Sequence, residues 1–448
     1  MSVARTPAAA SATFAVVTMG CPKNEADSDR LEAQLRGAGH RPAPLRTADL
    51  VLVNTCGFIA AAKQESIDVL LDACEAAHAR GARVAAYGCL IARHEAELRA
   101  ELPEIDVFSA FDTGKLLDLL AQIGAQARRT VRGGEEAPAG GTPRPPAAPP
   151  RRQRPTHAYV KISDGCDRRC SFCAIPLIKG TYETVAPGPI LAAAGAGLAA
   201  GARELVLVGQ DTSRWQWPGY GGLERLLGDL RSLGALWLRL LYLQPDGLSE
   251  AVLDALAAHG VPYVDLPLQH ASRPVLRAMG RDGDGESYLA LLERVRARLP
   301  QVAVRSTFMT GFPGETDDDV ETLIEFIAAA RLAVAGVFVF DAQDGTPAAA
   351  MADQVPEAER QERAARVSDA VARAARSYWG AFVGETVDVL VERGSRGVSS
   401  EVTGRIAQQA PDVDGLTYVA GARARRGQVV RALVSDIAGY HLLAQAVT

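Results

Sequence analysis

Three cysteines near the middle of the sequence are spaced C-x-x-x-C-x-x-C: Cys166, Cys170 and Cys173. A chain reaches at most about 3.6 Å per residue, so the three sulfur atoms must converge on one small object. Three thiolates without a fourth protein ligand suit an iron–sulfur cube that keeps one iron open, whereas a closed zinc site would require four ligands. The nearest histidine, His157, stands before the preceding predicted strand and is poorly placed as a fourth ligand. A zinc site and a buried structural role are the alternatives.

Three further cysteines each stand just after a short apolar run that is predicted to be a strand. The runs with their cysteines are 14–18 with Cys21, 50–53 with Cys56 and 84–87 with Cys89. Helical stretches alternate with these runs, a pattern typical of an open parallel α/β sheet covered by helices. Ligands bind at the carboxyl edge of such sheets, so the three cysteines can form a second site. Cys74 lies at helical spacing from Leu70 and Leu71, which predicts a buried core residue instead.

The same alternation of strands and helices resumes after His157. The candidate strands are residues 158–163, 204–208, 236–243, 263–266, 302–309 and 336–340. This series predicts a partial parallel (β/α) barrel, in which chemistry takes place on the loops that follow the strands. The loop with Cys166 follows the first strand, as that rule requires. Gln210 and Asp211 follow the second strand, and Thr316 with the aspartates at 317–319 is predicted to cap the helix after the fifth.

Outside these two regions the sequence predicts a linker, a helix and a small antiparallel β-barrel. Residues 126–155 are rich in Pro, Ala and Arg and cannot build a core. Residues 356–376 have helical spacing, and the four short alternating runs that follow are separated by turns that contain glycine. The domain boundaries predicted are therefore 13–125, 126–155, 156–376 and 377–448.

The composition excludes several classes of protein. A length of 448 residues suggests about three domains, and a hydrophobic content of 48% supports several cores. The net charge of −5 argues against a general polyanion binder. The sequence contains no apolar run of 18 residues and no export signal at its start, so a cytoplasmic protein without a membrane contact is expected. Seven cysteines, an odd number, favour cofactor ligation over a disulfide framework.

The CxxxCxxC motif, with Phe172 just before its last cysteine, resembles the signature of radical S-adenosylmethionine (radical SAM) enzymes. The resemblance implies a 4Fe-4S cluster whose open iron binds S-adenosylmethionine and cleaves it to a 5′-deoxyadenosyl radical, which can break an unactivated C–H bond. It also implies that the backbone near Phe172 holds the adenine, and no catalytic side chain is assigned beyond the clusters. The further candidates for contact with S-adenosylmethionine, or for support of its pocket, are Gln210, Asp211, Arg305 and Glu315. His270 is expected to orient or pack rather than to bind metal.

The segments around the other three cysteines resemble the N-terminal domain of methylthiotransferases. These segments read GCPKN at residues 20–24, NTCGFI at 54–59 and GCL at 88–90. The resemblance implies that Cys21, Cys56 and Cys89 hold an auxiliary 4Fe-4S cluster, so that two clusters and S-adenosylmethionine are the expected cofactors. Gly404, Arg405 and residues 410–415 in turn resemble the TRAM domain.

The motifs at residues 20–24, 54–59, 62–68 and 209–212 are similar to the RimO type of this family. That resemblance implies thiomethylation of the β-carbon of an aspartate in a small-subunit ribosomal protein (S-twelve). The second cluster would present the sulfur, which a further S-adenosylmethionine methylates. The implied partners are a low-potential electron donor such as flavodoxin or ferredoxin, and a sulfur donor. The alternative is a tRNA adenosine methylthiotransferase (MiaB-like), although those enzymes typically show Cys-Gln-Met-Asn at the first site. At Thr184 and Val185 the sequence departs from the Ser-Arg usual in the family.

The charge of residues 377–448 bears on the choice of substrate. This segment has seven arginines, no lysines and seven acidic residues, whereas RNA binding favours an excess of basic charge. Asp412 and Asp414 are expected to repel phosphate and to suit a basic ribosomal protein. RNA contact is therefore not favoured. A radical enzyme with one cluster and a non-catalytic RNA-binding metalloprotein are further alternatives.

Overall fold

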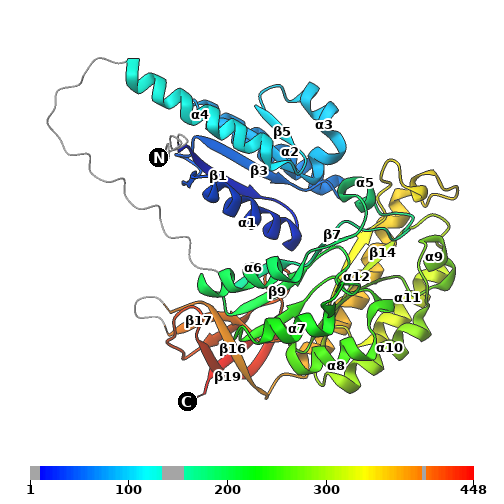
Figure 1. The fold of residues 1–448 in the computed structure, drawn as a ribbon. Helices are drawn as coiled ribbons and strands as arrows, with labels where there is room; N and C mark the ends of the chain where they lie inside the picture. The colour runs from blue at the N-terminus through cyan, green and yellow to red at the C-terminus, as the bar shows by residue number, and fades with distance from the viewer. Residues whose placement is uncertain (1–10, 134–155, 396–399, 448) are drawn as a thin grey trace. The chain divides into compact units, whose positions relative to one another are not determined.

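The computed structural model describes residues 11–133, 156–395 and 400–447, which form two compact units (Figure 1). The first unit is the described part of residues 1–153 together with Leu177–Lys179. The second contains the remainder of the chain from Arg154 onward. Helix α4 (Thr113–Gly133) extends past residue 126 into the segment predicted as a linker, and residues 134–155 of that segment lie outside the described residues.

The first unit is built around a parallel sheet. Within residues 11–133 five strands lie in the order β2-β1-β3-β4-β5. They are β1 (Thr13–Thr18), β2 (Arg41–Pro42), β3 (Leu50–Thr55), β4 (Arg83–Gly88) and β5 (Val107–Ser109). The other helices are α1 (Pro22–Gly37), α2 (Ala60–His78) and α3 (Cys89–Glu101). Successive strand residues point to opposite faces, so Val51 and Leu52 enter two different apolar clusters. The open α/β sheet is confirmed, and Cys74 is buried in one of these clusters as predicted.

The second unit begins with six parallel strands arranged as a partial barrel. Between residues 156 and 395 two three-stranded sheets have the orders β12-β9-β6 and β13-β14-β15. The strands are β6 (His157–Lys161), β9 (Glu204–Val208), β12 (Trp237–Leu240), β13 (Tyr263–Gln269), β14 (Ala303–Thr310) and β15 (Val334–Val339). The Leu243 amide donates a hydrogen bond to the Asp265 carbonyl (3.0 Å) and continues one sheet into the other. The six strands predicted for this region are confirmed, each within a few residues.

Short strands and helices connect and cover the barrel strands. The short strands are β7 (Ser163–Asp164), β8 (Glu183–Thr184), β10 (Gln216–Trp217) and β11 (Gly221–Gly222). The helices are α5 (Ile175–Lys179), α6 (Pro187–Ala199), α7 (Leu223–Arg231), η1 (Pro245–Gly247), α8 (Glu250–His259), α9 (Arg273–Ala278), α10 (Gly285–Arg298), α11 (Asp317–Ala330), η2 (Pro347–Ala350) and α12 (Glu357–Gly380). No helix among the described residues has both the length and the apolar character needed to cross a membrane.

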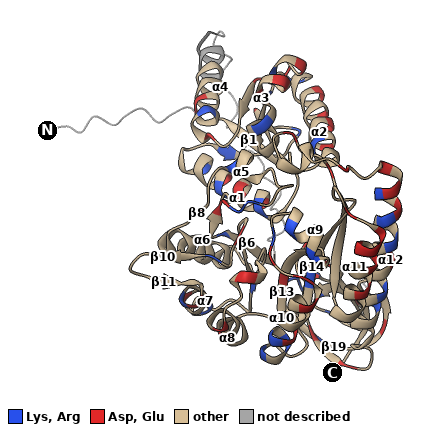
Figure 2. Cartoon of the chain, turned by 90° about the vertical axis from the view of Figure 1, so that its right-hand side faces the viewer, with Lys and Arg blue, Asp and Glu red and all other residues tan. Residues whose placement is uncertain are grey.

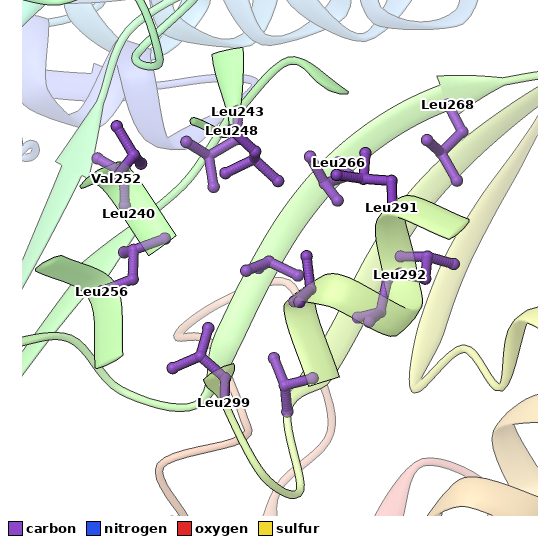
Figure 3. Packing of buried hydrophobic residues seen from close by; sticks show 14 of the residues in the cluster. Leu240, Leu243, Leu248, Val252, Leu256, Leu266, Leu268, Leu291, Leu292 and Leu299 are labelled. Atoms are coloured by element: carbon purple, nitrogen blue, oxygen red, sulfur yellow. The ribbon is translucent and has the colours of Figure 1, made fainter. Parts of the chain in front are cut away.

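The barrel core consists mainly of leucines from the strands and the covering helices. Figure 3 shows Leu266 and Leu268 of β13 beside Leu291 and Leu292 of α10, all of them buried. Helix α12 buries one face against the barrel, and the red and blue segments in Figure 2 show acidic and basic residues interspersed along the helix. At the start of α11, Thr316 and Asp319 form a capping box, which confirms the predicted cap.

The C-terminal segment forms a small closed barrel within the second unit. In residues 386–447, apart from the undescribed 396–399, its strands have the order β16-β17-β18-β20-β19. They are β16 (Thr386–Arg393), β17 (Glu401–Arg405), β18 (Thr417–Ala420), β19 (Val429–Ala438) and β20 (His441–Ala446). Four were predicted, and β20 was missed. Strands β18 and β20 are parallel, so the barrel is not wholly antiparallel. A Cβ at Gly404 would lie 2.2 Å from the Leu390 carbonyl oxygen, which explains glycine in the Gly404-Arg405 motif.

Candidate functional site

The N-terminal cysteines stand at the carboxyl ends of three neighbouring strands. Cys21 is the N-cap residue of α1 after β1, Cys56 follows the last residue of β3, and Cys89 begins α3 after β4. Burial, against the opposing charge of Lys179 and with help from the nearby Cys21 and Cys56, raises the pKa of the Cys89 thiol to about 12. The structure therefore brings the three thiols to one rim of the sheet. Thiols with raised pKa values remain protonated at neutral pH, so a bound metal must displace their protons.

One buried side chain contacts all three of these cysteine segments. The Asn24 amide nitrogen donates hydrogen bonds to the Met19 carbonyl (2.7 Å) and the Thr55 carbonyl (3.3 Å). The Cys89 sulfur lies 3.9 Å from the Asn24 Oδ1 atom. Asn54 in turn donates to the Asn24 carbonyl oxygen (2.9 Å). Asn24 is the last residue of the GCPKN motif, but no role was predicted for it from the sequence.

Two glycines allow the turns of this rim to approach one another closely. Gly20 has φ +93°, and a Cβ there would lie 2.9 Å from the Cys56 Cβ. Gly88 has φ +101°, and its Cβ would lie 2.5 Å from the Asn54 Oδ1. Any other residue at either position would combine backbone strain with a steric clash. The motif glycines beside Cys21 and Cys89 are thus required by the geometry of the rim.

The second set of cysteines lies on one loop between β7 and α5. Cys166 is buried, while Cys170 and Cys173 are half-buried. Burial raises the pKa of the Cys166 thiol. The Cys166 amide donates to the Gly180 carbonyl (3.1 Å), and the Cys173 amide donates to the Cys170 carbonyl (3.2 Å). None of the seven cysteines, all of which lie in the described ranges, forms a disulfide.

Asp211 supports the cysteine loop by binding Arg168. The Arg168 Nε donates to the buried Asp211 carboxylate (2.7 Å), and its two terminal nitrogens donate to Asp246 (2.9 Å each). Ser213 fixes the other oxygen of Asp211 through its hydroxyl group (2.6 Å). Burial raises the pKa of Asp246, but the hydrogen bond and charge of Arg168 outweigh this effect and lower it. Asp211 thus holds the loop that carries the cysteines, while its role in a pocket for S-adenosylmethionine stays a prediction. Arg168 was not predicted from the sequence.

An aromatic and apolar cluster lies beside the cysteine loop. Phe172 packs with Phe312 and Phe340, and the half-buried Cys170 and Cys173 border the same cluster. Phe312 and Phe340 meet edge to face, with ring centroids 5.3 Å apart. Phe312 belongs to the loop after β14, so the loops that follow two different strands build one wall. Such a wall suits an apolar or aromatic part of a ligand.

Glu315 organises the loop after β14 from inside the protein. Its carboxylate accepts hydrogen bonds from the Gly311 amide (2.8 Å) and from Arg363 (3.3 Å). The His270 Nε2 lies 3.4 Å from the other oxygen of Glu315, while the His270 Nδ1 accepts a hydrogen bond from the Ser272 amide (3.0 Å). The structure thus places Glu315 and His270 in the support of this loop.

Two buried polar atoms at the carboxyl ends of the barrel strands lack hydrogen-bond partners among the described residues. They are the Gln210 Oε1, just after β9, and the Thr310 Oγ1, at the end of β14. A buried polar group without a partner is costly unless a ligand or water bonds to it. These atoms, the aromatic cluster and the three-thiol loop fit the polar and apolar parts of S-adenosylmethionine beside a cluster.

Arg305 and the two C-terminal aspartates occupy a different place from the one predicted. Arg305 lies near the amino end of β14, where it donates to Asp265 (3.2 Å) and its Nε lies 3.6 Å from Asp414. Asp414 is fully buried, which raises its pKa. Asp412 accepts a hydrogen bond from Tyr159 (3.0 Å) and pairs with His157 (3.2 Å). These aspartates therefore bind the small barrel to the large one, and the prediction that they face a basic partner is wrong for the buried Asp414. Arg305 is not brought to the candidate pocket, because ion pairs hold it near the opposite edge.

Neither set of cysteines is arranged for a single metal ion. In the described ranges no group of three or more Cys, His, Asp or Glu side chains surrounds one ion position. In a cubic cluster, each thiolate binds a different iron atom, so the three sulfur atoms remain several ångströms apart. Two sets of three thiols, one on a single loop and one at three neighbouring strand ends, supply the donor chemistry that clusters require.

Fold and site together define the class of protein. Residues 160–327 match the family described as the radical SAM superfamily, residues 383–447 match the TRAM domain, and residues 13–110 match "Uncharacterized protein family UPF0004". The chain is a radical SAM enzyme whose cofactors are 4Fe-4S clusters and S-adenosylmethionine.

Similar proteins identify the particular family. The "Ribosomal protein uS12 methylthiotransferase RimO" of Anaeromyxobacter sp. (strain Fw109-5) is 39% identical over 447 residues, which cover 96% of this chain and 92% of that protein. The protein of the same name from Nocardioides sp. (strain ATCC BAA-499 / JS614) is 41% identical over 473 residues, with 96% of each chain covered. This chain belongs to the RimO family.

Solved structures of other radical SAM enzymes share the fold. The methyltransferase TsrM from Kitasatospora setae matches with a TM-score of 0.53 and 17% identity over 75% of this chain and 77% of that one. The cobalamin-dependent enzyme OxsB matches with a TM-score of 0.50 and 12% identity over 81% of this chain and 56% of that one. At these identities the likeness concerns the fold alone.

Proposed function

We propose that this chain transfers a methylthio group to the β-carbon of an aspartate in ribosomal protein uS12. The observation that carries the proposal is the presence of two three-thiol sets, one on the loop after the first barrel strand and one on the rim of the N-terminal sheet. The RimO relatives, named for uS12, support this substrate over the tRNA adenosine of the MiaB-like alternative.

Each set of cysteines holds one cluster in this proposal. Cys166, Cys170 and Cys173 bind the cluster that engages S-adenosylmethionine, and Cys21, Cys56 and Cys89 bind the auxiliary cluster. The bound cofactors supply an electron, a carbon radical that removes hydrogen from the substrate, and the sulfur and methyl group that are transferred. The protein contributes ligands, orientation and the exclusion of water.

The S-adenosylmethionine pocket lies at the carboxyl ends of the barrel strands. Phe172 and its aromatic neighbours flank the adenine, and the Gln210 side chain offers an unpaired oxygen to a donor group of the ligand. Asp211 acts through Arg168, a residue of the cysteine loop that it holds in position. Glu315 acts through the Gly311 amide, which fixes the loop that carries Phe312. Arg305 has no part in this pocket.

The reaction also requires partners that the chain must meet. A low-potential reductant such as flavodoxin or ferredoxin supplies the electron. Cluster potentials range from about −700 to +450 mV, and the cleavage of S-adenosylmethionine needs a potential at the low end of this range. A sulfur donor renews the transferred sulfur. Because ribosomal proteins are made and assembled in the cytoplasm, we place the reaction there. The domain boundaries at 13–125, 156–376 and 377–448 stay part of the proposal.

Mass spectrometry of uS12 and tRNA tests the proposal directly. Cells that lack this gene should contain uS12 without the methylthio group on its aspartate, and their tRNA should be unchanged. The purified chain, loaded with iron and sulfide and supplied with reductant and S-adenosylmethionine, should restore the mass to uS12. A missing modification on tRNA adenosine, with uS12 unchanged, would instead support the MiaB-like alternative.

A further inference from the structure

We infer that Arg281 sets the reduction potential of the barrel cluster by donating a hydrogen bond to the sulfur of Cys170. The Arg281 Nη1 lies 3.8 Å from the Cys170 Sγ, within hydrogen-bond range for sulfur. This inference rests on the proposed assignment of Cys170 as a cluster ligand. It adds to that assignment a side chain that positions charge beside the cluster and does not itself bind metal or substrate.

Two acceptors hold the guanidinium group of Arg281 in this orientation. Its Nη2 donates to the Pro267 carbonyl (2.8 Å) and to the Gln244 side-chain oxygen (3.1 Å). Asp246 is close enough to interact with the charge of Arg281, but both hydrogen-bond acceptors are neutral and no ion pair of the described residues includes Arg281. Arg168 differs in this respect, because two carboxylates neutralise it. The positive charge of Arg281 is therefore available to the thiolate.

The backbone that carries Arg281 is fixed to the cysteine loop at three further points. The Ser171 amide donates to the Met279 carbonyl (2.9 Å), and the Ser171 hydroxyl group donates to the Ala278 carbonyl (2.7 Å). Gly280 has φ +71°, and a Cβ there would lie 2.5 Å from the Arg169 carbonyl oxygen. Residues 278–281 and the loop around Cys170 are thus packed together, so this backbone and the two acceptors of the guanidinium group jointly set the distance from Arg281 to Cys170.

Electrostatics determines the direction of the effect. The reduced form of the cluster carries one more negative charge than the oxidised form. A hydrogen bond from a charged donor to a ligand sulfur therefore stabilises the reduced form more, and hydrogen bonds to the sulfur atoms are among the factors that set cluster potentials. Arg281 should raise the potential and make the cluster easier to reduce by a biological donor.

The test is a redox titration of the full chain, loaded with both clusters and followed by electron paramagnetic resonance. The barrel cluster is identified as the signal that changes when S-adenosylmethionine is added. Arg281→Gln should lower its midpoint potential, with an expected change of about tenfold in the ratio of oxidised to reduced cluster, which is about 59 mV for a one-electron couple. Arg281→Lys, which keeps the charge, should shift less than half as far.

Arg277→Gln is the matched control. Arg277 is exposed at the end of α9, and it should leave the potential nearly unchanged. An equal shift from Arg277→Gln, or no shift from Arg281→Gln with its iron retained, would overturn the inference. Loss of the cluster from both Arg281 variants would also overturn it, since it would show a purely structural role. If the wild-type chain itself had no signal that responds to S-adenosylmethionine, the proposed function would fail instead.

Discussion

The two cysteine sets reach the same chemistry by opposite routes. In the barrel, Cys166, Cys170 and Cys173 stand on a single loop, so their proximity is a property of the local chain. On the N-terminal rim, the three cysteines follow β1, β3 and β4, and only the assembled sheet brings them together. The loop set therefore needs only contacts that hold the loop in place, whereas the rim set exists only once the whole N-terminal sheet has folded.

The bracing differs accordingly. The barrel loop is held from outside by side chains of other loops, with Asp211 binding Arg168 and the residues after α9 binding Ser171. The rim is held from within by Asn24, which bonds to the segments beside two of the cysteines and contacts the third. Because metal binding and folding are coupled, a cluster on the rim should stabilise its domain more than a cluster on the loop does.

The largest expected effect comes from removing a ligand of either set. Cys166→Ser should lower the iron content from about eight to about four atoms per chain and abolish cleavage of S-adenosylmethionine. Cys56→Ser should lose a similar amount of iron but keep the cleavage, while the methylthio product disappears. Iron assay, release of 5′-deoxyadenosine and the mass of uS12 measure the three effects.

Cys74→Ala is the control for these variants, because Cys74 is a buried core residue away from the rim. It should retain all of its iron. A Cys56→Ser chain that kept about eight irons would refute a second cluster at the rim.

The next largest effect concerns stability without a change in metal. Glu204 is fully buried between Arg239 (2.7 Å) and Arg405 (2.7 Å) at the amino end of the barrel. Burial raises the pKa of Glu204, but the two arginines outweigh it and lower the pKa. Glu204→Gln leaves the buried Arg239 without a carboxylate partner among the described residues, while Arg405 keeps Glu392 (2.7 Å). The substitution should reduce the free energy of unfolding by about 3–5 kcal/mol. Urea unfolding of the full chain measures this.

An exposed ion pair gives the matched control for Glu204. Glu321→Gln removes the nearer of two acidic partners of Arg366, from the surface of α11, and should cost less than about 1 kcal/mol. The folded fraction of Glu204→Gln should still contain the full iron complement. Loss of iron from the folded Glu204→Gln chain would show that the cysteine loop, at the carboxyl ends of the barrel strands, depends on the ion pairs at their amino ends. That result would contradict the expectation that local bracing holds the loop.

A smaller effect tests the bracing of the rim. Asn24→Ala leaves two carbonyl oxygens without their donor and should destabilise the first unit by about 1–3 kcal/mol. The rim cluster should be lost more readily than the barrel cluster when a chelator is added, as followed by absorbance and iron assay. Gln64→Ala, which removes only an exposed bond to Asp68, is the control and should behave like the wild type.

The smallest effect concerns helix α10, which follows residues 278–281, the segment that holds the cysteine loop. Asp284 caps α10, and hydrogen bonds from the Ser287 backbone, Arg273 and the Ser287 hydroxyl lower its pKa to about 2. The unfolded value is about 3.9, so the carboxylate contributes stability above about pH 4 that is lost as the pH falls toward 2. Asp284→Ala should cost about 1 kcal/mol at pH 7. Asp284→Asn keeps the cap and should cost less, and a loss that did not shrink with acid would contradict the role of the charge.

The sequence determined the features that depend on neighbours along the chain. Cys166, Cys170 and Cys173 lie so near one another along the chain that their proximity follows from the sequence alone. The strands around them follow from runs of apolar residues. The position of a cysteine just past a strand also predicted the rim, because parallel strands align their carboxyl ends. The capping box of α11 is equally local. The prediction failed within the ten residues after β19: β20 was missed, because no periodic pattern distinguished it from a tail.

Only the tertiary structure decided which charged and polar side chains meet. An aspartate in a loop is expected to be exposed, yet the Asp414 side chain is buried beside Arg305, which is distant in sequence. Asp211 and Arg168 form a brace across the barrel mouth, and Asn24 bonds across three separate turns. Such pairings depend on the distances between segments remote in sequence, and no local pattern records these distances. The cysteines that would bind the clusters could therefore be predicted from the sequence, whereas the side chains that hold these cysteines in place could be identified only in the folded structure.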